Sequence, residues 1–162
     1  MRDRRDGDAG RAGRKSWVNT HSAGERTLQE LPSAEEAQRY SALASALANE
    51  GFRLVSGGTD CHLMVVDLRP FDAELTGKEA QAVLDLAGIT LNKNTVPDDP
   101  RSPFVTSGVR VGTASVTTQG MKEAEMTQIA SLIARALRGR ADQGALAQVK
   151  ADVASLCAKF PA

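Results

Sequence analysis

Cysteine is scarce in this chain of 162 residues, and neither basic nor acidic residues are in excess. Its two cysteines, Cys61 and Cys157, lie far apart and without CxxC spacing, so neither a disulfide framework nor a zinc site is predicted. We expect both thiols to be buried or half-buried. Basic and acidic residues number 20 each, which excludes a global basic surface for nucleic acid and an acidic solvating tail. The sequence therefore predicts no metal and no nucleic-acid partner.

Long hydrophobic runs are missing as well. No stretch approaches the roughly 18 apolar residues of a membrane span, and the first residues carry Arg, Asp and Gly where a secretory signal needs an apolar segment. The sequence thus predicts a cytoplasmic protein without a membrane partner. Aromatic residues make up 4% of the chain, so alanine-rich segments must supply much of the packing. The length suits one domain, or one domain with a tail.

Residues 1–30 have a composition typical of disorder. They mix Arg, Asp and Gly with almost no apolar periodicity, so they cannot bury enough surface to offset the entropy lost on ordering. Asp3, Asp6 and Asp8 interrupt their positive charge, which argues against a nucleic-acid-binding arm. We expect a disordered or non-homologous tail at 1–30 and a folded domain at 31–162.

Apolar periodicity begins at Ser33 and predicts the elements of that domain. Capping-box patterns start at Ser33 and Thr76, and Gly51 and Gly88 are placed to end the helices that follow. Helices are predicted at 33–50 and 76–87 and around 129–137 and 146–160. Strands are predicted at 52–55, 62–68, 89–92 and 109–112, the first two as a hairpin.

The order of these elements, α-β-β-α-β-loop-β-α-α, predicts an α+β fold with a small, mostly antiparallel sheet and helices on one face. The loop at 93–108 contains Pro97, Pro100 and Pro103. A loop of this length in a compact domain is usually functional or disordered.

The most specific pattern in the chain is residues 91–113, LNKNTVPDDPRSPFVTSGVRVGT. This segment resembles the substrate and folate segment of serine hydroxymethyltransferases almost residue for residue. Residues 56–70, SGGTDCHLMVVDLRP, are similar to a hairpin of the same family. The resemblance covers about residues 33–160, the C-terminal small domain. It implies a fold-type I pyridoxal phosphate enzyme, a homo-oligomer, that interconverts serine and glycine with tetrahydrofolate as the one-carbon acceptor.

The resemblance also implies roles for particular residues. Arg110 matches the arginine that binds the substrate carboxylate, and its planar, permanently charged guanidinium suits bidentate contact with a carboxylate. Asn94 matches the residue that contacts the folate pterin. The corner formed by Ser102, Pro103 and Phe104 would line the folate slot.

Structural roles are the alternatives for these residues. On residue type alone, Arg110 would be a surface or ion-paired arginine, and Asn94 would be a turn residue. Lys93 either meets the folate tail or is solvated, and His62 is favoured as a structural histidine. The chain departs from the family pattern at three positions, which are Cys61 (commonly Asn or Thr), Ala114 (Pro) and Gln119 (Arg).

The chemistry of the cofactor is not evident in the chain. The resemblance implies a lysine that follows a Thr-rich stretch and a His and holds pyridoxal phosphate. No lysine has that setting, and no glycine loop for the cofactor phosphate is evident; the lysines are Lys15, Lys78, Lys93, Lys122, Lys150 and Lys159. We therefore expect no catalytic residue here and no stable cofactor binding by the chain alone.

Three interpretations follow from this mixture of a matching segment and a missing lysine. The chain is a truncated or frameshifted piece of the enzyme, a subunit that rejoins a separately encoded large domain, or a standalone folate or amino-acid binding module without chemistry. The sequence favours the first interpretation.

Overall fold

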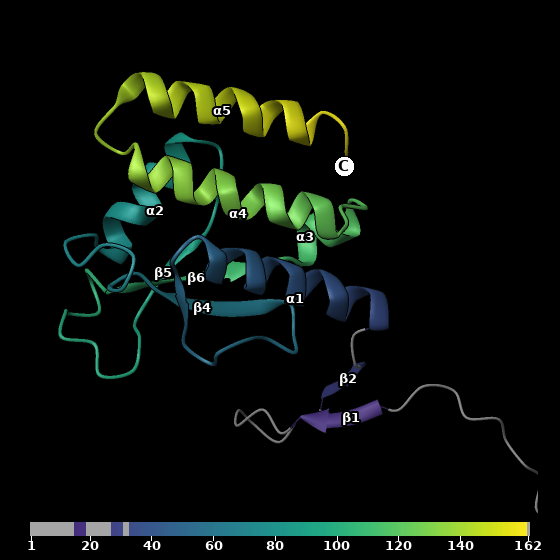
Figure 1. Cartoon of the computed structure of the whole chain (residues 1–162). Coiled ribbons are helices and arrows are strands. Elements are labelled where there is room, and N and C mark those ends of the chain that lie inside the picture. Colours follow the sequence, from purple (N-terminus) through teal and green to yellow (C-terminus); the bar gives the residue numbers. More distant parts are fainter. Residues whose placement is uncertain (1–14, 19–26, 31–32, 162) are drawn as a thin grey trace, which may run out of the picture. The chain divides into compact units, whose positions relative to one another are not determined.

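The structure is a computed structural model that describes residues 15–18, 27–30 and 33–161. It divides the chain into two units, Met1–Ser33 and Ala34–Ala162. The second unit contains four strands and five helices (Figure 1). The strands are β3 (Arg53–Leu54), β4 (Leu63–Asp67), β5 (Asn92–Asn94) and β6 (Gly108–Gly112). The helices are α1 (Ala34–Asn49), α2 (Gly77–Leu86), α3 (Ala114–Thr118), α4 (Glu123–Arg138) and α5 (Gln143–Cys157).

In the first unit the structure describes two short strands, β1 (Lys15–Val18) and β2 (Thr27–Glu30), which pair antiparallel. The sequence does not predict this hairpin. The other residues of the expected tail lie outside the described residues, so the tail at 1–30 stays a prediction.

The four strands of the second unit form one sheet in the order β3-β4-β6-β5, and every neighbouring pair is antiparallel. The predicted hairpin of the first two strands is present as β3 and β4. In the central pair, Met64 lies opposite Val111 and Val66 lies opposite Val109. All four of these side chains are buried. Because side chains alternate across a strand, they share one face of the sheet.

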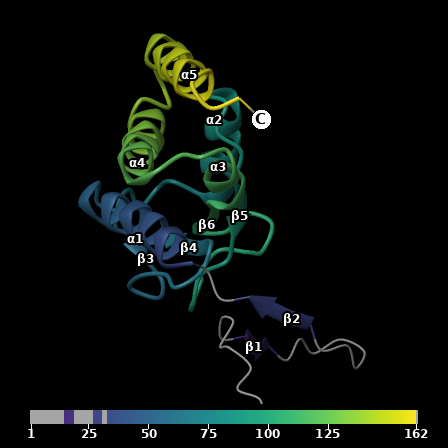
Figure 2. The ribbon, with the colours of Figure 1, turned by 90° about the vertical axis from the view of Figure 1, so that its right-hand side faces the viewer.

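The helices cover that apolar face, as the α+β prediction requires. In Figures 1 and 2 all the helices of the second unit lie on one side of the sheet, and α5 packs on the outer side of α4. The spacing of apolar residues in α4 explains its central position. Its buried side chains are Met126, Ala130, Leu132, Ile133, Ala134, Ala136 and Leu137.

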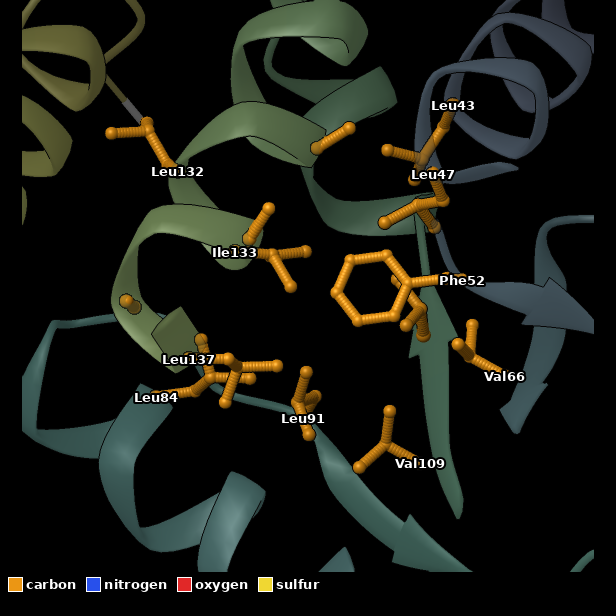
Figure 3. Packing of buried hydrophobic residues seen from close by; sticks show 14 of the residues in the cluster. Leu43, Leu47, Phe52, Val66, Leu84, Leu91, Val109, Leu132, Ile133 and Leu137 are labelled. Carbon is orange, nitrogen blue, oxygen red and sulfur yellow. The ribbon is translucent and has the colours of Figure 1, made fainter. Parts of the chain in front are cut away.

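The core lies between the sheet and the helices α1, α2 and α4. Figure 3 shows Ile133 of α4 pointing toward Phe52, with Val66 and Val109 of the sheet nearby. Leu84 of α2 and Leu91, which precedes β5, belong to the same cluster. This single cluster joins all the layers of the domain. Burial of apolar area is therefore the main source of the domain's stability.

Some of the capping residues predicted from the sequence are found at the helix ends. Thr76 Oγ1 accepts a hydrogen bond from Glu79 N at 3.1 Å, which is half of the predicted capping box. The Glu79 carboxylate bonds Arg140 Nε instead. Gly51 and Gly88 follow α1 and α2 with φ of 99° and 81°, a conformation that glycine adopts without a steric penalty.

The observed elements differ from the predicted ones in two details. The strand expected at 89–92 is β5 at Asn92–Asn94, because β6 reaches only these residues and the preceding apolar side chains fill the core instead. The helix α3 is not predicted at all. It has five residues, which is too short for a periodic pattern, and its β-branched side chains lower helix propensity.

The prediction that both cysteines are at least half-buried is wrong. Cys61 and Cys157 are free and exposed. Cys61 lies in the connection between β3 and β4, and Cys157 is the last residue of α5. Cysteine is usually buried for its apolar character, but neither of these two residues belongs to the buried core cluster.

Leu137→Ala is expected to destabilise the domain by about 2–5 kcal/mol, because it removes a fully buried side chain from the centre of the core. The same change at Leu86, which is 66% exposed, is the control and should alter the free energy of unfolding by less than about 0.5 kcal/mol. Urea denaturation of the two variants measures both values. Equal losses would contradict the core described here.

Candidate functional site

The candidate site lies on the sheet face that the helices leave uncovered. Strand alternation puts Arg110 and Gly112 of β6 on this face, with Val65 of β4 and Asn92 of β5 opposite Arg110 in the register. Asn94 is two residues from Asn92 and shares the face. The antiparallel pairing of β5 with β6 therefore brings together Arg110 and Asn94, which are 16 positions apart in the chain.

The Arg110 guanidinium has few contacts. Its side chain is exposed, and Nη2 donates to Asn92 Oδ1 across a long 3.4 Å. It forms no ion pair with any residue of the described part of the chain. A carboxylate from outside the domain could therefore take the bidentate contact that its planar fork offers.

A buried carboxylate on the same face is already neutralised by other arginines. Asp67, which is 1% exposed, accepts from Arg53 Nη2 and from Arg69 at Nε and Nη2. Burial acts to raise the pKa of Asp67, but the hydrogen bonds and charge of Arg69, with the charge of Arg53, lower it below the usual value. Asp67 thus stays charged and paired, and Arg110 remains available.

The loop between β5 and β6 is organised around the Asp99 carboxylate. Asp99 Oδ2 accepts from the amides of Val96 (3.2 Å) and Ser107 (2.9 Å). Asp99 Oδ1 accepts from the Arg101 amide (3.0 Å) and the Ser107 hydroxyl (2.7 Å). One side chain therefore binds both ends of the loop.

These contacts hold Asp99 in its charged form. Burial acts to raise its pKa, yet hydrogen bonds from the Ser107 hydroxyl and from the Arg101, Ser107 and Val96 amides outweigh burial and lower the pKa to about 2. The network therefore forms fully at neutral pH.

Arg101 ties the same loop to the segment before α2. Its Nη1 donates to Leu75 O at 2.9 Å and to the Ser107 hydroxyl at 3.3 Å, and its Nη2 donates to Ala73 O at 2.7 Å. Unlike Arg110, Arg101 donates its hydrogen bonds to carbonyl and hydroxyl groups of the domain itself. Its role is structural.

The loop also closes onto the first turn of α2. The amides of Gly77 and Lys78 donate to Thr106 O and Val105 O, which satisfies two of the free N–H groups at the helix start. A Cβ at Gly77 would collide with Thr106 Oγ1 and with the Gly108 carbonyl oxygen, so only glycine allows this approach. Thr106 is held at φ 60°, a sparsely populated conformation for a β-branched residue.

The Ser102–Pro103–Phe104 corner is a tight turn. Ser102 O accepts from the amides of Val105 and Thr106, and Pro103 O accepts from Lys93 Nζ at 3.2 Å. Phe104 is 82% exposed at the turn. An exposed aromatic side chain on an otherwise anchored loop is suited to contact with a ligand or another polypeptide.

The sequence predicted Arg110, Asn94, Ser102, Pro103 and Phe104 as site residues. The structure places Arg110 and Asn94 on one face of a strand pair, and it places the other three in the loop between those strands. Asn94 donates from Nδ2 to Thr95 O at 2.7 Å.

Two residues that hold this arrangement, Asp99 and Arg101, were not predicted. The composition of the loop, with its three prolines, does not indicate which side-chain hydrogen bonds order it. The sequence feature that marks these two residues is Asp99-Pro100-Arg101, in which an Asp precedes a Pro and an Arg follows two residues after the Asp.

The described lysines do not fit the anchoring of pyridoxal phosphate. A Schiff-base lysine is activated by desolvation or by a neighbouring cation, whereas Lys93 is half-buried and the other lysines of residues 33–161 are exposed.

The described residues include no group of three or more His, Cys, Asp or Glu side chains placed to hold a metal ion. None of the described helices is long and apolar enough to cross a membrane.

Comparison with known proteins shows the family of the chain. A family model described as serine hydroxymethyltransferase matches residues 33–133, which include the whole candidate site. A protein named serine hydroxymethyltransferase from Myxococcus xanthus (strain DK1622) is 58% identical over 120 residues, covering 74% of this chain and 28% of that protein. The chain belongs to the serine hydroxymethyltransferase family. It spans about 28% of the length of this curated relative.

Asp99→Asn is expected to lower the free energy of unfolding at pH 7 by about 1–3 kcal/mol, because the charged acceptor of four hydrogen bonds is lost. Asp98→Asn, at the adjacent exposed position with φ 52°, is the matched control and should have little effect. Urea denaturation of both variants tests this. Equal stability of the two variants would contradict the network.

The effect of Asp99 should also depend on pH. A carboxyl whose pKa falls from 3.8 to about 2 on folding stabilises the fold fully above pH 3.8 and loses this contribution as the pH falls through about 2. The stability difference between the unsubstituted chain and Asp99→Asn should therefore shrink below pH 4. A constant difference down to pH 2 would exclude the lowered pKa.

Proposed function

We propose that this chain provides the substrate-carboxylate and folate side of a serine hydroxymethyltransferase active site. The observation that carries the proposal is Arg110, exposed and without an ion pair among the described residues, beside a loop that the domain itself anchors. In this proposal the reaction is the interconversion of serine and glycine with tetrahydrofolate as the one-carbon acceptor.

Arg110 would bind the carboxylate of serine or glycine. A bidentate charge-assisted contact fixes both the position and the orientation of a small amino acid. The neighbouring Asn92 side chain supports the guanidinium from the adjacent strand, since Asn92 Oδ1 accepts from Arg110 Nη2. The charge of Arg110 is available for this role because Asp67 is paired with Arg53 and Arg69.

The loop that contains Asn94, Ser102, Pro103 and Phe104 would bind the folate. An amide side chain such as Asn94 can both donate and accept hydrogen bonds, as the edge of a pterin ring requires. Phe104 offers an exposed aromatic face. Because the Asp99 network already orders this loop, ligand binding would lose little conformational entropy.

The cofactor chemistry is assigned to residues outside this chain. Pyridoxal phosphate supplies an electron sink in the family, but the lysines of residues 33–161 do not fit its attachment. We therefore propose that the chain is inactive by itself, and that it acts with a large domain, in one polypeptide or as a separate subunit. Homo-oligomerisation and a cytoplasmic location stay predictions.

The isolated chain should not catalyse serine cleavage. Purified chain mixed with pyridoxal phosphate, serine and tetrahydrofolate is expected to show no turnover above the free-cofactor background. Borohydride reduction should not give a cofactor adduct on one particular lysine. Turnover together with a single modified lysine would show that the chain holds a complete active site.

A chimera tests the role of Arg110. The matching segment of the Myxococcus xanthus protein is replaced by residues 33–161 of this chain, and serine cleavage is measured. Arg110→Ala should raise the KM for serine about 30-fold to 1000-fold, since a charge-assisted bidentate contact is lost. Arg110→Lys should have a KM for serine close to that of Arg110→Ala, because an ammonium cannot make two parallel hydrogen bonds to a carboxylate.

Arg135→Ala is the control in the same chimera. Arg135 is exposed and pairs with Asp152 between α4 and α5, far from β6 in the chain. This variant should leave the KM for serine unchanged, because Arg135 belongs to the helices that cover the other face of the sheet and its exposed ion pair contributes little to stability. An unchanged KM in Arg110→Ala would exclude the carboxylate role.

A further inference from the structure

A cavity of about 160 Å³ lies on the helix-covered side of the sheet, among α3, α4, α5 and the end of β6. Val111 and Gly112 of β6 line it, whereas Arg110, Asn94 and the corner at 102–104 do not. The cavity is therefore separate from the candidate site. The serine hydroxymethyltransferase function proposed for the chain does not use it.

The walls of the cavity are almost entirely apolar. Ile129 and Leu132 of α4, Val153 and Leu156 of α5, and Met121 all line it. Among the lining residues, Thr90, Thr113 and Cys157 carry a polar side-chain atom, and the Thr113 hydroxyl already donates to His62 O at 3.4 Å. Water would find few partners on such walls.

The size of the cavity suits a small organic molecule. Protein interiors are close-packed, and voids much larger than a water molecule are uncommon. An apolar cavity of roughly 150 Å³ stays dry and accepts a benzene ring. We propose that the cavity between α4 and α5 is a binding site for a small apolar molecule about the size of a substituted benzene.

The surroundings of the cavity provide a route of entry. Cys157 lines the cavity and is also exposed, so the cavity reaches solvent at the C-terminal end of α5. The α5 wall lies beyond residues 33–133, which match the family model. The site therefore depends on a part of the chain to which that match assigns no role.

The two cysteines allow a direct test with toluene as the probe. Cys157 lies at the cavity and Cys61 lies in the β3–β4 connection, and both are exposed. In a Cys61→Ser chain, toluene should slow the reaction of Cys157 with a thiol reagent, with half-saturation at about 1 mM or below. In a Cys157→Ser chain, toluene should leave the rate at Cys61 unchanged.

A cavity-filling substitution gives the second arm of the test. Val153→Phe in the Cys61→Ser chain puts a ring into the cavity and should weaken toluene binding at least about tenfold. The matched control is Val55→Phe in the same background, at a half-buried position outside the cavity lining. It should bind toluene as before.

Phenol tests the chemical class of the ligand. It has nearly the size of toluene, but its hydroxyl would exchange water for a lining with few polar atoms, so phenol should bind at least about tenfold more weakly. Equal slowing of both cysteines, the absence of saturation, or unchanged binding in a folded Val153→Phe chain would overturn the proposal. If Val153→Phe does not fold, the reaction rates of Cys157 and Cys61 in the presence of toluene and phenol still test the proposal.

Discussion

The hydrogen bonds to the Asp99 carboxylate are the interaction on which the ligand side of this domain depends. The loop that joins β5 to β6 carries three prolines and makes no strand pairing of its own, so side-chain contacts order it together with backbone hydrogen bonds to the first turn of α2. Asp99 binds amides at both of its ends, and Arg101 attaches it to the segment before α2. The turn with Phe104 is thereby held in place without a ligand.

The alternation of side chains along β6 separates two kinds of surface. Val109 and Val111 pack against the helices, and Arg110 between them faces the uncovered side. A shift of one residue in the register would bury the guanidinium and expose the valines, so the apolar core also fixes the orientation of Arg110. Core packing and the candidate site are therefore coupled through one strand, while the apolar cavity lies on the opposite face.

Much of the fold could be predicted because local patterns agree with it. Thr76 and Gly88 bound α2 as their residue types suggest, and the apolar spacing in α4 matches its buried face. The site residues, in contrast, came from a resemblance rather than from periodicity. Asp99 could not be predicted as the centre of the loop, because its partners depend on how residues 96 and 107 meet in space. The exposure of Cys157 likewise depends on how α5 packs.

Hydrogen exchange of the ligand-free chain at neutral pH measures most directly whether the ligand side is already formed. The amides of Val96, Arg101 and Ser107 donate to Asp99 and should exchange at least about tenfold more slowly than the amide of Phe104 at the exposed turn. Exchange of all four amides at the rate of an unstructured peptide would contradict a loop that is ordered before any ligand binds.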